Sequence, residues 1–404
     1  MAHAAAPAYL GTQHQEASPA QRFGLLCPIW NEQWGKDAKA AHAALKSVTR
    51  LSSDDAARLR ALALRQAALF APMLSSGQAL RLHARAVAPF TTGLGNEHPL
   101  ENGFAFLNPY GLPYLAGSGV KGVLRQAARE LAGGSWGDPV GWSLDRGYTL
   151  RIDEKTVAFS VIDALFGLET EPGEKEHVRG ALSFWDTLPQ FDQLRVDVMT
   201  PHQTHYHQGG QTPHESASPV PINFLTVPPG TAFIFHVVCD STRLQRLAPG
   251  LSDRWQPMMQ AAFAHAYAWL GFGAKTAVGY GEMVADEAAA QAQQTVDKRL
   301  REAEAQQAQA ASLAQMPPGQ RAVETFAARM QAAAAVSGLG KQALGGQFYS
   351  LARELAKSAS MASDWSAAEK SAAADAIELW VPQLVNIDAK KLRKKLELGA
   401  LRQL

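Results

Sequence analysis

Cysteine, an excess of charge of either sign, and long apolar runs are all scarce in this chain. Only two cysteines are present, which disfavours a disulfide scaffold and suits a reducing cytoplasm. Lys and Arg total 38 against 37 Asp and Glu, a balance of +1, so any basic surface that attracts nucleic acid must be local. No run of about 18 apolar residues occurs, and the N-terminus lacks a cationic start followed by an apolar core. We therefore expect neither secretion nor a membrane span, but a cytoplasmic protein.

The length of 404 residues and the apolar content of 47% predict one principal domain with appendages, or two domains. Residues 1–20 are small and polar, and we expect them to be mobile. A helix is predicted to follow Ser52 or Ser53, either of which can cap it. From residue 285 onward Ala, Gln, Glu and Lys dominate, which indicates helices. We predict a mobile N-terminus with a helical extension over 1–75, a mixed domain over 76–290 and helices over 291–404.

Alternation of apolar and polar residues predicts the strands of the central domain. Between Leu80 and Val87 the apolar side chains alternate with Arg81, His83 and Arg85, which is typical of a half-buried strand with a basic outer face. Further strands are predicted over 180–185, 194–199, 222–227, 231–239 and 278–284, and a helix over 253–270. Trp269 is expected to be in the core. The basic run at 390–395 is interpreted either as a solvated face or as a contact with RNA or a neighbouring subunit.

The most informative motif is the segment Gly271-Phe-Gly-Ala-Lys-Thr-Ala-Val-Gly-Tyr-Gly281, in which two glycine pairs flank Lys275. Glycine permits positive φ and lets another backbone approach closely. Such a loop can present its N–H groups and one lysine to a phosphate chain. It does not fit a P-loop, because Lys275-Thr276 follows alanine and tryptophan stands where the first glycine is required.

A second motif, Gly117-Ser-Gly-Val-Lys121-Gly-Val-Leu-Arg125, begins a predicted amphipathic helix. A lysine in the first helical turn opposes the macrodipole, which is sensible if an anion lies at the same helix end. The alternative is that Lys121 extends into water. The segment also satisfies GxGxxG, but no apolar strand precedes it and a loop follows the helix, so a nicotinamide-binding fold is disfavoured.

Two further stretches are candidates for the same surface. The turn that contains Gly93 and Gly95 follows the basic strand and can bend the chain over the face that residues 117–121 occupy. Four histidines, His202 and His205 among them, fall within thirteen positions of a Gly- and Pro-rich stretch. Such a loop can bind zinc, offer donors to phosphates, or be an ordinary solvated loop, and the residues alone leave these open.

Several features follow one another along the chain: the strand from Leu80, Gly93-Leu-Gly95, Leu112-Pro-Tyr-Leu-Ala-Gly-Ser-Gly-Val-Lys-Gly-Val-Leu-Arg125, Arg179-Gly-Ala-Leu-Ser-Phe-Trp-Asp186, Thr200-Pro-His202 and the glycine-rich loop. Taken in this order, they resemble the RAMP superfamily of CRISPR proteins. Within it, the resemblance is greatest to the family of sixth subunits of type III-B, or Cmr, effector complexes. The resemblance covers residues 80–286. Ala116 departs from it, since relatives usually carry proline there. This changes the stiffness of the turn and leaves the phosphate-facing atoms in place.

The resemblance implies an α+β fold with a ferredoxin-like (RRM-like) βαββαβ core, a glycine-rich loop, N-terminal helices and an all-helical C-terminal extension. It also implies a noncatalytic RNA-binding and assembly subunit that caps a stack of related subunits and holds the 3′ portion of the guide RNA, without cofactor or metal. The implied partners are guide RNA, target RNA, the RAMP backbone and end subunits, and a small helical subunit, with no membrane.

We expect RNA to contact a set of glycines, basic residues and histidines from these motifs. The set is Gly93, Gly95, Gly117, Ser118, Gly119, Lys121, Arg125, Arg179, His202, His205, Gly271, Gly273, Lys275, Gly279, Tyr280 and Gly281. Lys121 and Lys275 are predicted to converge on one anionic cradle. The alternative is a metal-independent endoribonuclease that processes CRISPR RNA, in which His202 or His205 is the general base that activates the 2′-hydroxyl.

Overall fold

The computed structural model of the protein describes residues 2–12, 14–37, 40–137, 139–152, 155–169, 177–200, 209, 212, 221–335 and 340–403. The chain divides into two compact units, Met1–Ala292 and Gln293–Leu404. The first unit combines helices with strands and the second is helical, so the predicted mixed fold with a helical C-terminal region is confirmed. Within the described ranges, no helix has both the length and the apolar character that crossing a membrane requires.

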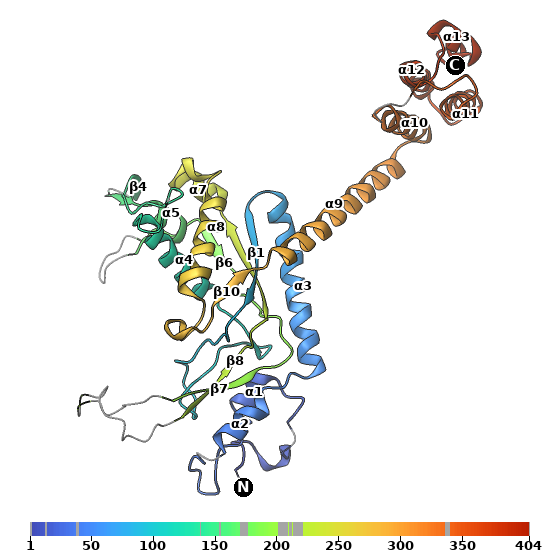
Figure 1. Cartoon of the computed structure of the whole chain (residues 1–404). Coiled ribbons are helices and arrows are strands. Elements are labelled where there is room, and N and C mark those ends of the chain that lie inside the picture. The colour runs from blue at the N-terminus through green and yellow to red at the C-terminus, as the bar shows by residue number, and fades with distance from the viewer. Residues whose placement is uncertain are drawn as a thin grey trace. The chain divides into compact units, whose positions relative to one another are not determined.

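A four-stranded antiparallel sheet organises the first unit (Figure 1). Its strands are β1 (Ala79–Ala86), β6 (Leu182–Phe184), β9 (Ala232–Cys239) and β10 (Met283–Ala285), and they lie in the order β10-β1-β9-β6. Helix α4 (Gly117–Ala132) separates β1 from β6, and α8 (Trp255–His265) separates β9 from β10. Along the chain these six elements therefore run strand, helix, strand, strand, helix, strand.

The predicted alternation of β1 is confirmed, because Leu80, Ala84 and Ala86 are buried in the main core. Phe233 and Phe235 of β9 and Phe263 of α8 belong to the same core. The buried positions of α4 recur at helical spacing, as its sequence predicts. One face of the sheet thus packs against α4 and α8, since the apolar residues of all these elements form one cluster.

Helix α3 (Ser53–Ser75) covers part of the opposite face, on which Arg81, His83 and Arg85 lie. Its N-terminus is the predicted one: Ser52 is the N-cap, and its side chain accepts a hydrogen bond from the N–H of Asp55 at 3.0 Å. Phe70 of α3 is fully buried, and its ring centroid lies 4.5 Å from that of His236 on β9. The outer face predicted to be basic is therefore partly covered by a helix.

The N-terminal residues pack on this unit through a buried arginine. Arg22 of α1 (Pro19–Phe23) donates to the backbone oxygens of Ala17 and Ser47, both at 2.9 Å, and to that of Arg50. Burial lowers the pKa of the Arg22 guanidinium from its usual value, against the attraction of Asp55. These bonds tie α1 to α2 (Ala41–Val48) and to the start of α3.

Three two-stranded hairpins and several short helices complete the first unit. The hairpins are β2–β3 (Phe106–Leu107 and Leu112–Pro113), β4–β5 (Tyr148–Ile152 and Lys155–Phe159) and β7–β8 (Arg195–Met199 and Ile222–Thr226). The short helices are η1 (Ala8–Leu10), α5 (Val161–Phe166), α7 (Ser241–Leu247), η2 (Pro249–Leu251), η3 (Ala266–Leu270) and η4 (Thr276–Val278). The last strand predicted, 278–284, is shorter than expected, because Gly279 and Gly281 have positive φ and extended pairing begins only at Met283.

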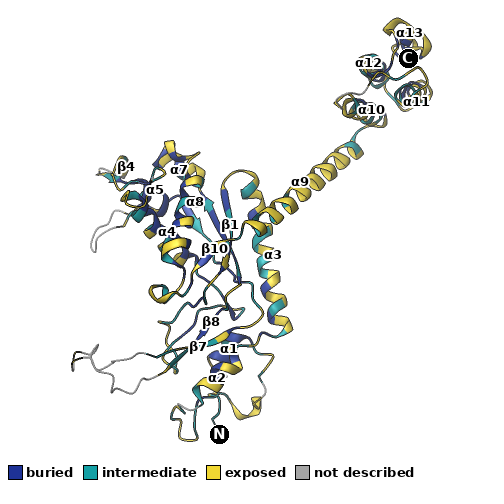
Figure 2. Ribbon diagram, viewed as in Figure 1, coloured by how far each residue is buried: buried dark blue, intermediate teal, exposed yellow. Residues whose placement is uncertain are grey.

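The C-terminal unit has its own core. Helices α10 (Pro318–Ala334), α11 (Gln347–Met361), α12 (Ala367–Leu384), α13 (Ala389–Lys395) and α14 (Leu398–Leu401) enclose Met330, Ile377, Val381 and Leu392. Helix α9 (Glu287–Gln315) has no buried residue, and Figure 2 shows it exposed along its length. Pro318 begins α10, with Pro317 as its N-cap.

Candidate functional site

The glycine-rich loop, defined here as Gly271–Gly281, alternates between left-handed and ordinary backbone. The φ angles are 67° at Gly271, 92° at Gly273, 91° at Gly279 and 73° at Gly281, and Lys275 also has a positive φ of 60°. Glycine adopts such angles without the steric cost that a side chain brings. The glycine pattern is therefore required by the path of the chain.

The backbone segment that packs closely against the glycine-rich loop belongs to the protein itself. Ala274 donates its N–H to the backbone oxygen of Thr91 at 2.8 Å, and Gly281 donates to that of Pro89 at 2.8 Å. A Cβ placed on Gly273 would lie 2.3 Å from the oxygen of Thr91, and one on Gly281 would lie 1.8 Å from the oxygen of Phe272. Gly273 and Gly281 therefore permit close packing against neighbouring backbone.

These internal contacts use most of the N–H groups that we expected to face a phosphate. Seven of the eleven loop N–H groups, those of residues 271, 272, 274 and 278–281, donate to backbone oxygens of the protein. Among the described residues, no acceptor takes the N–H groups of Gly273, Lys275, Thr276 and Ala277. The expectation that the whole loop presents its amides is therefore corrected to four amides within residues 273–277, where the N–H of Ala274 is bonded internally.

Two side chains of the loop rest on the β7–β8 hairpin. The Nζ atom of Lys275 lies 3.3 Å from Sδ of Met199 and 5.1 Å from the ring centroid of Phe224. The Tyr280 hydroxyl donates to Oδ2 of Asp197 at 2.7 Å. Desolvation, with a smaller effect of Asp197, raises the pKa of Tyr280 to about 12. Tyr280, expected to contact RNA, uses its hydroxyl to anchor the loop.

Lys275 keeps its charge available for an anion. No carboxylate of a described residue lies within ion-pair distance of its ammonium group. Its contacts are with a thioether and the face of an aromatic ring, which attract a cation more weakly than a carboxylate does. Lys275 is half-buried, and the four unbonded N–H groups belong to it and to neighbouring residues of the same loop.

The turn with Gly93 and Gly95 follows directly on the backbone that holds the glycine-rich loop. Thr91 accepts from Ala274, and two residues later Gly93 has a φ of 70°, with its Cα in contact with Ala105. Gly95 is exposed and has open space beside it. The hydrogen bonds place the start of this turn against the glycine-rich loop, and its expected bend over the face of residues 117–121 stays a prediction.

The N-terminus of α4 is already occupied by a carboxylate of the protein. Gly117 donates its N–H to Oδ1 of Asp186 at 2.7 Å, and a Cβ at Gly117 would lie 2.1 Å from the oxygen of Phe184. Gly117 is buried, whereas Ser118 and Gly119 are exposed. The N–H of Gly119 donates to Ala116. The expected anion at this helix end is thus replaced by Asp186, and Gly117 serves packing.

Lys121, Arg125 and Arg179 form what we call the basic cluster. Burial lowers the pKa of Lys121 from its usual value, and the nearby positive charges of Arg125 and Arg179 lower it further. The guanidinium of Arg125 is held inside the protein, because it donates to the backbone oxygen of Gly167 at 2.8 Å and the side chain is only 13% exposed. Among described residues, no carboxylate lies within ion-pair distance of Lys121 or Arg179, although the charge of Arg179 acts on Asp240 and helps to lower its pKa. An anion that bound there would relieve the repulsion between these two side chains.

Arg125 is expected from the sequence to contact RNA, but the structure gives it an internal role. Besides Gly167, it lies 3.4 Å from Asp163 and 3.3 Å from Glu169, so it ties α4 to the end of α5. The signal for this role is non-local, because all three partners follow Arg125 by 38 residues or more.

The other end of α4 adjoins the residues that lead into the glycine-rich loop. His265, at the end of α8, lies 2.6 Å from Glu130, and its ring centroid is 4.9 Å from that of Trp136. Trp136 also lies 4.8 Å from Trp269, which is 65% exposed, so the expectation that Trp269 is a core residue is wrong. Lys121 precedes Glu130 by nine residues, so about 13 Å of helix rise separates these two positions along α4.

Lys121 and Lys275 therefore belong to two separate groups of contacts. Lys121 lies with Arg125 and Arg179, whereas Lys275 lies on Met199 and Phe224. Among the described residues, no hydrogen bond or ion pair joins the two groups. The convergence of both lysines on one cradle stays a prediction.

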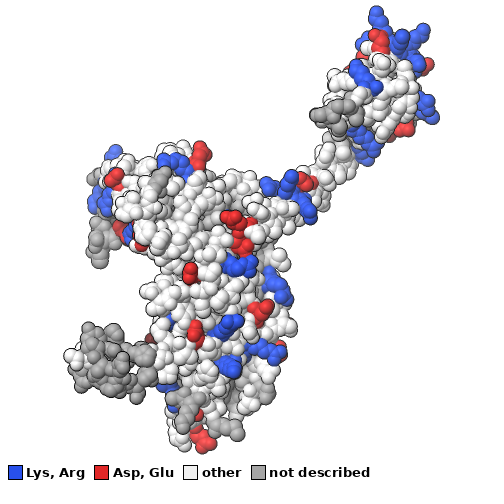
Figure 3. Space-filling model, in the orientation of Figure 1, with Lys and Arg blue, Asp and Glu red and all other residues white. Residues whose placement is uncertain are grey.

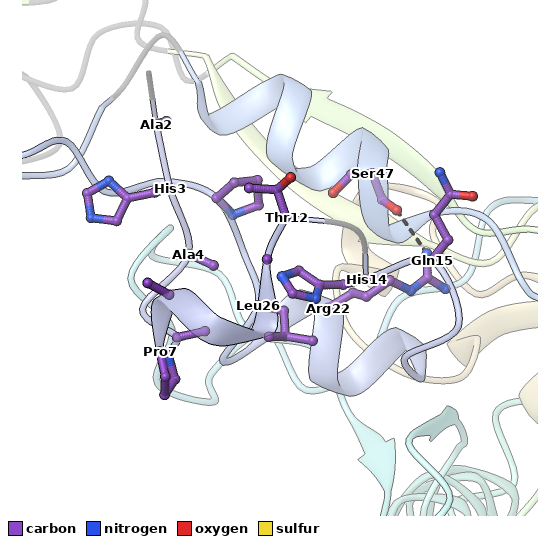
Figure 4. Close-up of a pocket in the computed structure, with 14 residues that line it drawn as sticks. Ala2, His3, Ala4, Pro7, Thr12, His14, Gln15, Arg22, Leu26 and Ser47 are labelled. Atoms are coloured by element: carbon purple, nitrogen blue, oxygen red, sulfur yellow. Dashed lines mark hydrogen bonds between the residues drawn. The ribbon is translucent and has the colours of Figure 1, made fainter.

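His202 and His205 lie outside the described residues. Among the residues that the structure does describe, no group of three His, Cys, Asp or Glu side chains is arranged to hold a metal ion. A pocket of about 580 Å³ lies between residues 2–15 and helices α1 and α2 (Figure 4). Arg22 reaches it, but the guanidinium is bonded to the oxygen of Ser47, as the dashed line shows, and none of the predicted RNA contacts lines this pocket.

The partners of the loop were missed by reasoning from sequence. Met199, Phe224 and Asp197 support Lys275 and Tyr280, yet they lie 51 to 83 residues away along the chain. Their strands are recognisable by alternation, but nothing local indicates which loop they hold. Asp186 was noticed only as part of a motif, and its hydrogen bond to Gly117 has no local signal either.

Comparisons with known proteins show which family this chain resembles. The model of the RAMP superfamily matches residues 83–284, half of the chain. The chain is similar to the CRISPR system Cmr subunit Cmr6 of Pyrococcus furiosus, with 28% identity over 261 residues, covering 53% of this chain and 70% of the relative.

Two solved structures are also similar. One is a chain of the type III-B Cmr-beta bound to cognate target RNA, with a TM-score of 0.39 and 18% identity, covering 61% of this chain and 70% of that one. The other is the crystal structure of Cmr6 from Pyrococcus furiosus, with a TM-score of 0.27 and 25% identity, covering 51% of this chain and 97% of that one.

Proposed function

Because this chain belongs to the RAMP superfamily, we propose that it is a noncatalytic RNA-binding and assembly subunit of a type III-B CRISPR effector complex. In this proposal it caps the stack of backbone subunits and holds the 3′ portion of the guide RNA for recognition of viral target RNA. The similarity to the Cmr subunit Cmr6 supports the type of complex. Its partners would be the guide, the target and the other subunits of that complex.

The observation that carries the proposal is the tip of the glycine-rich loop. Among the described residues, the N–H groups of Gly273, Lys275, Thr276 and Ala277 have no internal acceptor, and the ammonium of Lys275 in the same loop has no carboxylate partner. Backbone amides and lysines bind phosphate oxygens without reading bases, as a subunit that accepts guides of any sequence requires. The family match spans this loop.

We further propose that the basic cluster provides a second phosphate contact on the same RNA. Lys121 and Arg179 repel each other, and among the described residues no carboxylate lies within ion-pair distance of either, so a phosphate between them would be stabilised. Ser118 and Gly119 are exposed one turn away. Gly117 and Arg125 are assigned to the scaffold that holds this cluster.

The sheet supports a ferredoxin-like core for this subunit. The six elements β1, α4, β6, β9, α8 and β10 follow the βαββαβ order, and numbering the strands along the chain gives the sheet order 4-1-3-2. In this core the glycine-rich loop connects the second helix to the last strand, which fixes both of its ends.

The test is RNA binding by the full-length chain with Lys121→Ala and Lys275→Ala combined. Each single-stranded phosphate contact contributes about 0.7 to the slope of log K against log salt, so losing two should flatten the slope by about 1.4 and weaken binding about fourteenfold near 0.15 M salt. The loss should be equal for RNAs of unrelated sequence.

Arg60→Ala with Arg65→Ala is the matched control, because these exposed α3 residues remove the same charge from the same unit. Equal losses in the two double variants, or no loss in either, would contradict the assignment of the lysines. Incubation with CRISPR repeat RNA tests the noncatalytic part: site-specific cleavage that His202→Ala abolishes would identify an endoribonuclease instead.

A further inference from the structure

Helix α13 carries a lysine face, which we define as Lys390, Lys391, Lys394 and Lys395. All four residues are exposed, and the buried residue Leu392 fixes the helix orientation against the core of the C-terminal unit. At about 100° per residue, the four lysines fall within an arc of about 140°, and Leu392 lies outside that arc. The core therefore forces the four ammonium groups to one solvent-facing side.

The lysine face has little internal charge compensation. No carboxylate of a described residue pairs with any of the four ammonium groups, whereas Arg393, between them in sequence, holds Glu378 at 2.7 and 2.8 Å. The acids nearest in sequence are Asp388, whose side chain caps α13, and Glu397. Figure 3 shows Lys and Arg atoms gathered over this part of the C-terminal unit.

The two units of the chain differ in charge. Residues 293–404 contain 15 Lys and Arg against 11 Asp and Glu, a balance of +4, whereas residues 1–292 contain 23 against 26, a balance of −3. The chain as a whole is nearly neutral, but its C-terminal unit is basic. The four lysines of the lysine face equal the net positive charge of that unit. A local excess of this kind attracts polyanions and depends strongly on salt.

We propose that the lysine face of α13 is a second, independent contact for the phosphate backbone of RNA. Lysines at i, i+1, i+4 and i+5 supply compact charges that accept any phosphate geometry. Residues 389–403 contain no aromatic side chain, so this surface has no platform for stacking bases and would bind without regard to sequence. The charge pattern itself indicates a polyphosphate chain, and the choice of RNA rests on the proposed function.

The experiment compares two fourfold variants of the full-length protein that lose the same charge. The test variant is Lys390→Gln, Lys391→Gln, Lys394→Gln and Lys395→Gln, with Arg393 kept because it holds Glu378. The control is Arg329→Gln, Lys341→Gln, Arg353→Gln and Lys357→Gln, all exposed and without an ion pair among the described residues of the same unit.

Affinity for a single-stranded RNA of mixed sequence is measured as a function of salt, in the wild-type background and with Lys121→Ala and Lys275→Ala. If two lysines contact phosphates, the test variant should lose about fourteenfold in affinity near 0.15 M salt, and if all four do, about two hundredfold, with a salt slope flatter by about 1.4 to 2.8. The control should lose clearly less.

An equal loss in both fourfold variants, or none in the test variant, overturns the proposal. So does a test variant that keeps its RNA affinity while losing binding to vesicles with anionic lipid or to an acidic peptide. The two proposals can also be separated. If the test variant loses RNA affinity while Lys121→Ala and Lys275→Ala have no effect of their own, the result supports the lysine face and refutes the proposed role of those two lysines.

Discussion

Two glycines of the loop, Gly273 and Gly279, separate the strain of a positive φ from the need for close packing. Their φ angles are nearly equal, 92° and 91°. A Cβ on Gly279 would meet nothing within 4 Å, whereas one on Gly273 would lie 2.3 Å from the oxygen of Thr91 and 2.6 Å from the ring of Phe90. Alanine at the two positions therefore tests the loop's attachment with the backbone strain held constant.

The magnitudes follow from these contacts. Gly279→Ala should cost about 1 to 2 kcal/mol, the strain of a left-handed residue with a side chain. Gly273→Ala carries the same strain, and it also forces the loop away from Thr91, which adds about 1 kcal/mol for the lost Ala274 hydrogen bond and about 1 to 3 kcal/mol for overpacking. The difference between the variants should thus be about 2 to 4 kcal/mol.

Hydrogen exchange of the Ala274 amide is the direct assay, because this N–H donates to Thr91 at 2.8 Å. In Gly273→Ala its protection should fall much further than in Gly279→Ala, and RNA affinity should fall with it, since a displaced loop no longer presents its four N–H groups. Equal protection in the two variants would refute the packing argument. Lost protection with unchanged RNA affinity would separate the loop from RNA binding.

Three more predictions concern the scaffold. Arg125→Ala should lower the free energy of unfolding by about 2 kcal/mol, because its bond to Gly167 and its buried charge pairing are lost, and chemical denaturation measures this. Tyr280→Phe should weaken the attachment of the loop to Asp197 by about 1 kcal/mol, seen as faster exchange of the loop amides; unchanged exchange would contradict it. His236 has a pKa of about 4, lowered mainly by burial, against about 6.5 when unfolded, so the unfolded state binds the extra proton between these values. Stability should therefore fall by up to about 3 kcal/mol as pH drops from about 6.5 to 4, and a His236→Gln variant with an equally steep fall would contradict this origin.

The parts of the fold that were predictable are those that local patterns determine. Alternation along β1, the cap at Ser52 and the apolar stripe of α4 depend on neighbours within a few residues, and all three are confirmed. The glycine pattern indicated positive φ and close approach, and both are present in the loop at Gly273 and Gly281.

The parts that were not predictable depend on partners far along the chain. Sequence does not show that Thr91 and Pro89 take loop N–H groups, or that Asp186 takes the one at Gly117. These acceptors decide which amides remain for a ligand, and they leave four amides within residues 273–277. Trp269 illustrates the same limit, because its apolar surroundings in sequence did not reveal that its ring lies beside Trp136 at the surface.

The central claim, that the tip of the glycine-rich loop lies on RNA, is tested most directly by crosslinking. A photoreactive amino acid at Ala277, which is exposed and whose N–H has no acceptor in the described part of the chain, should crosslink to the guide RNA in the assembled complex. The same group at the exposed Ala61 of α3 serves as the control and should give no RNA crosslink. Crosslinks from position 277 to protein alone, with the guide present and bound, would contradict the account.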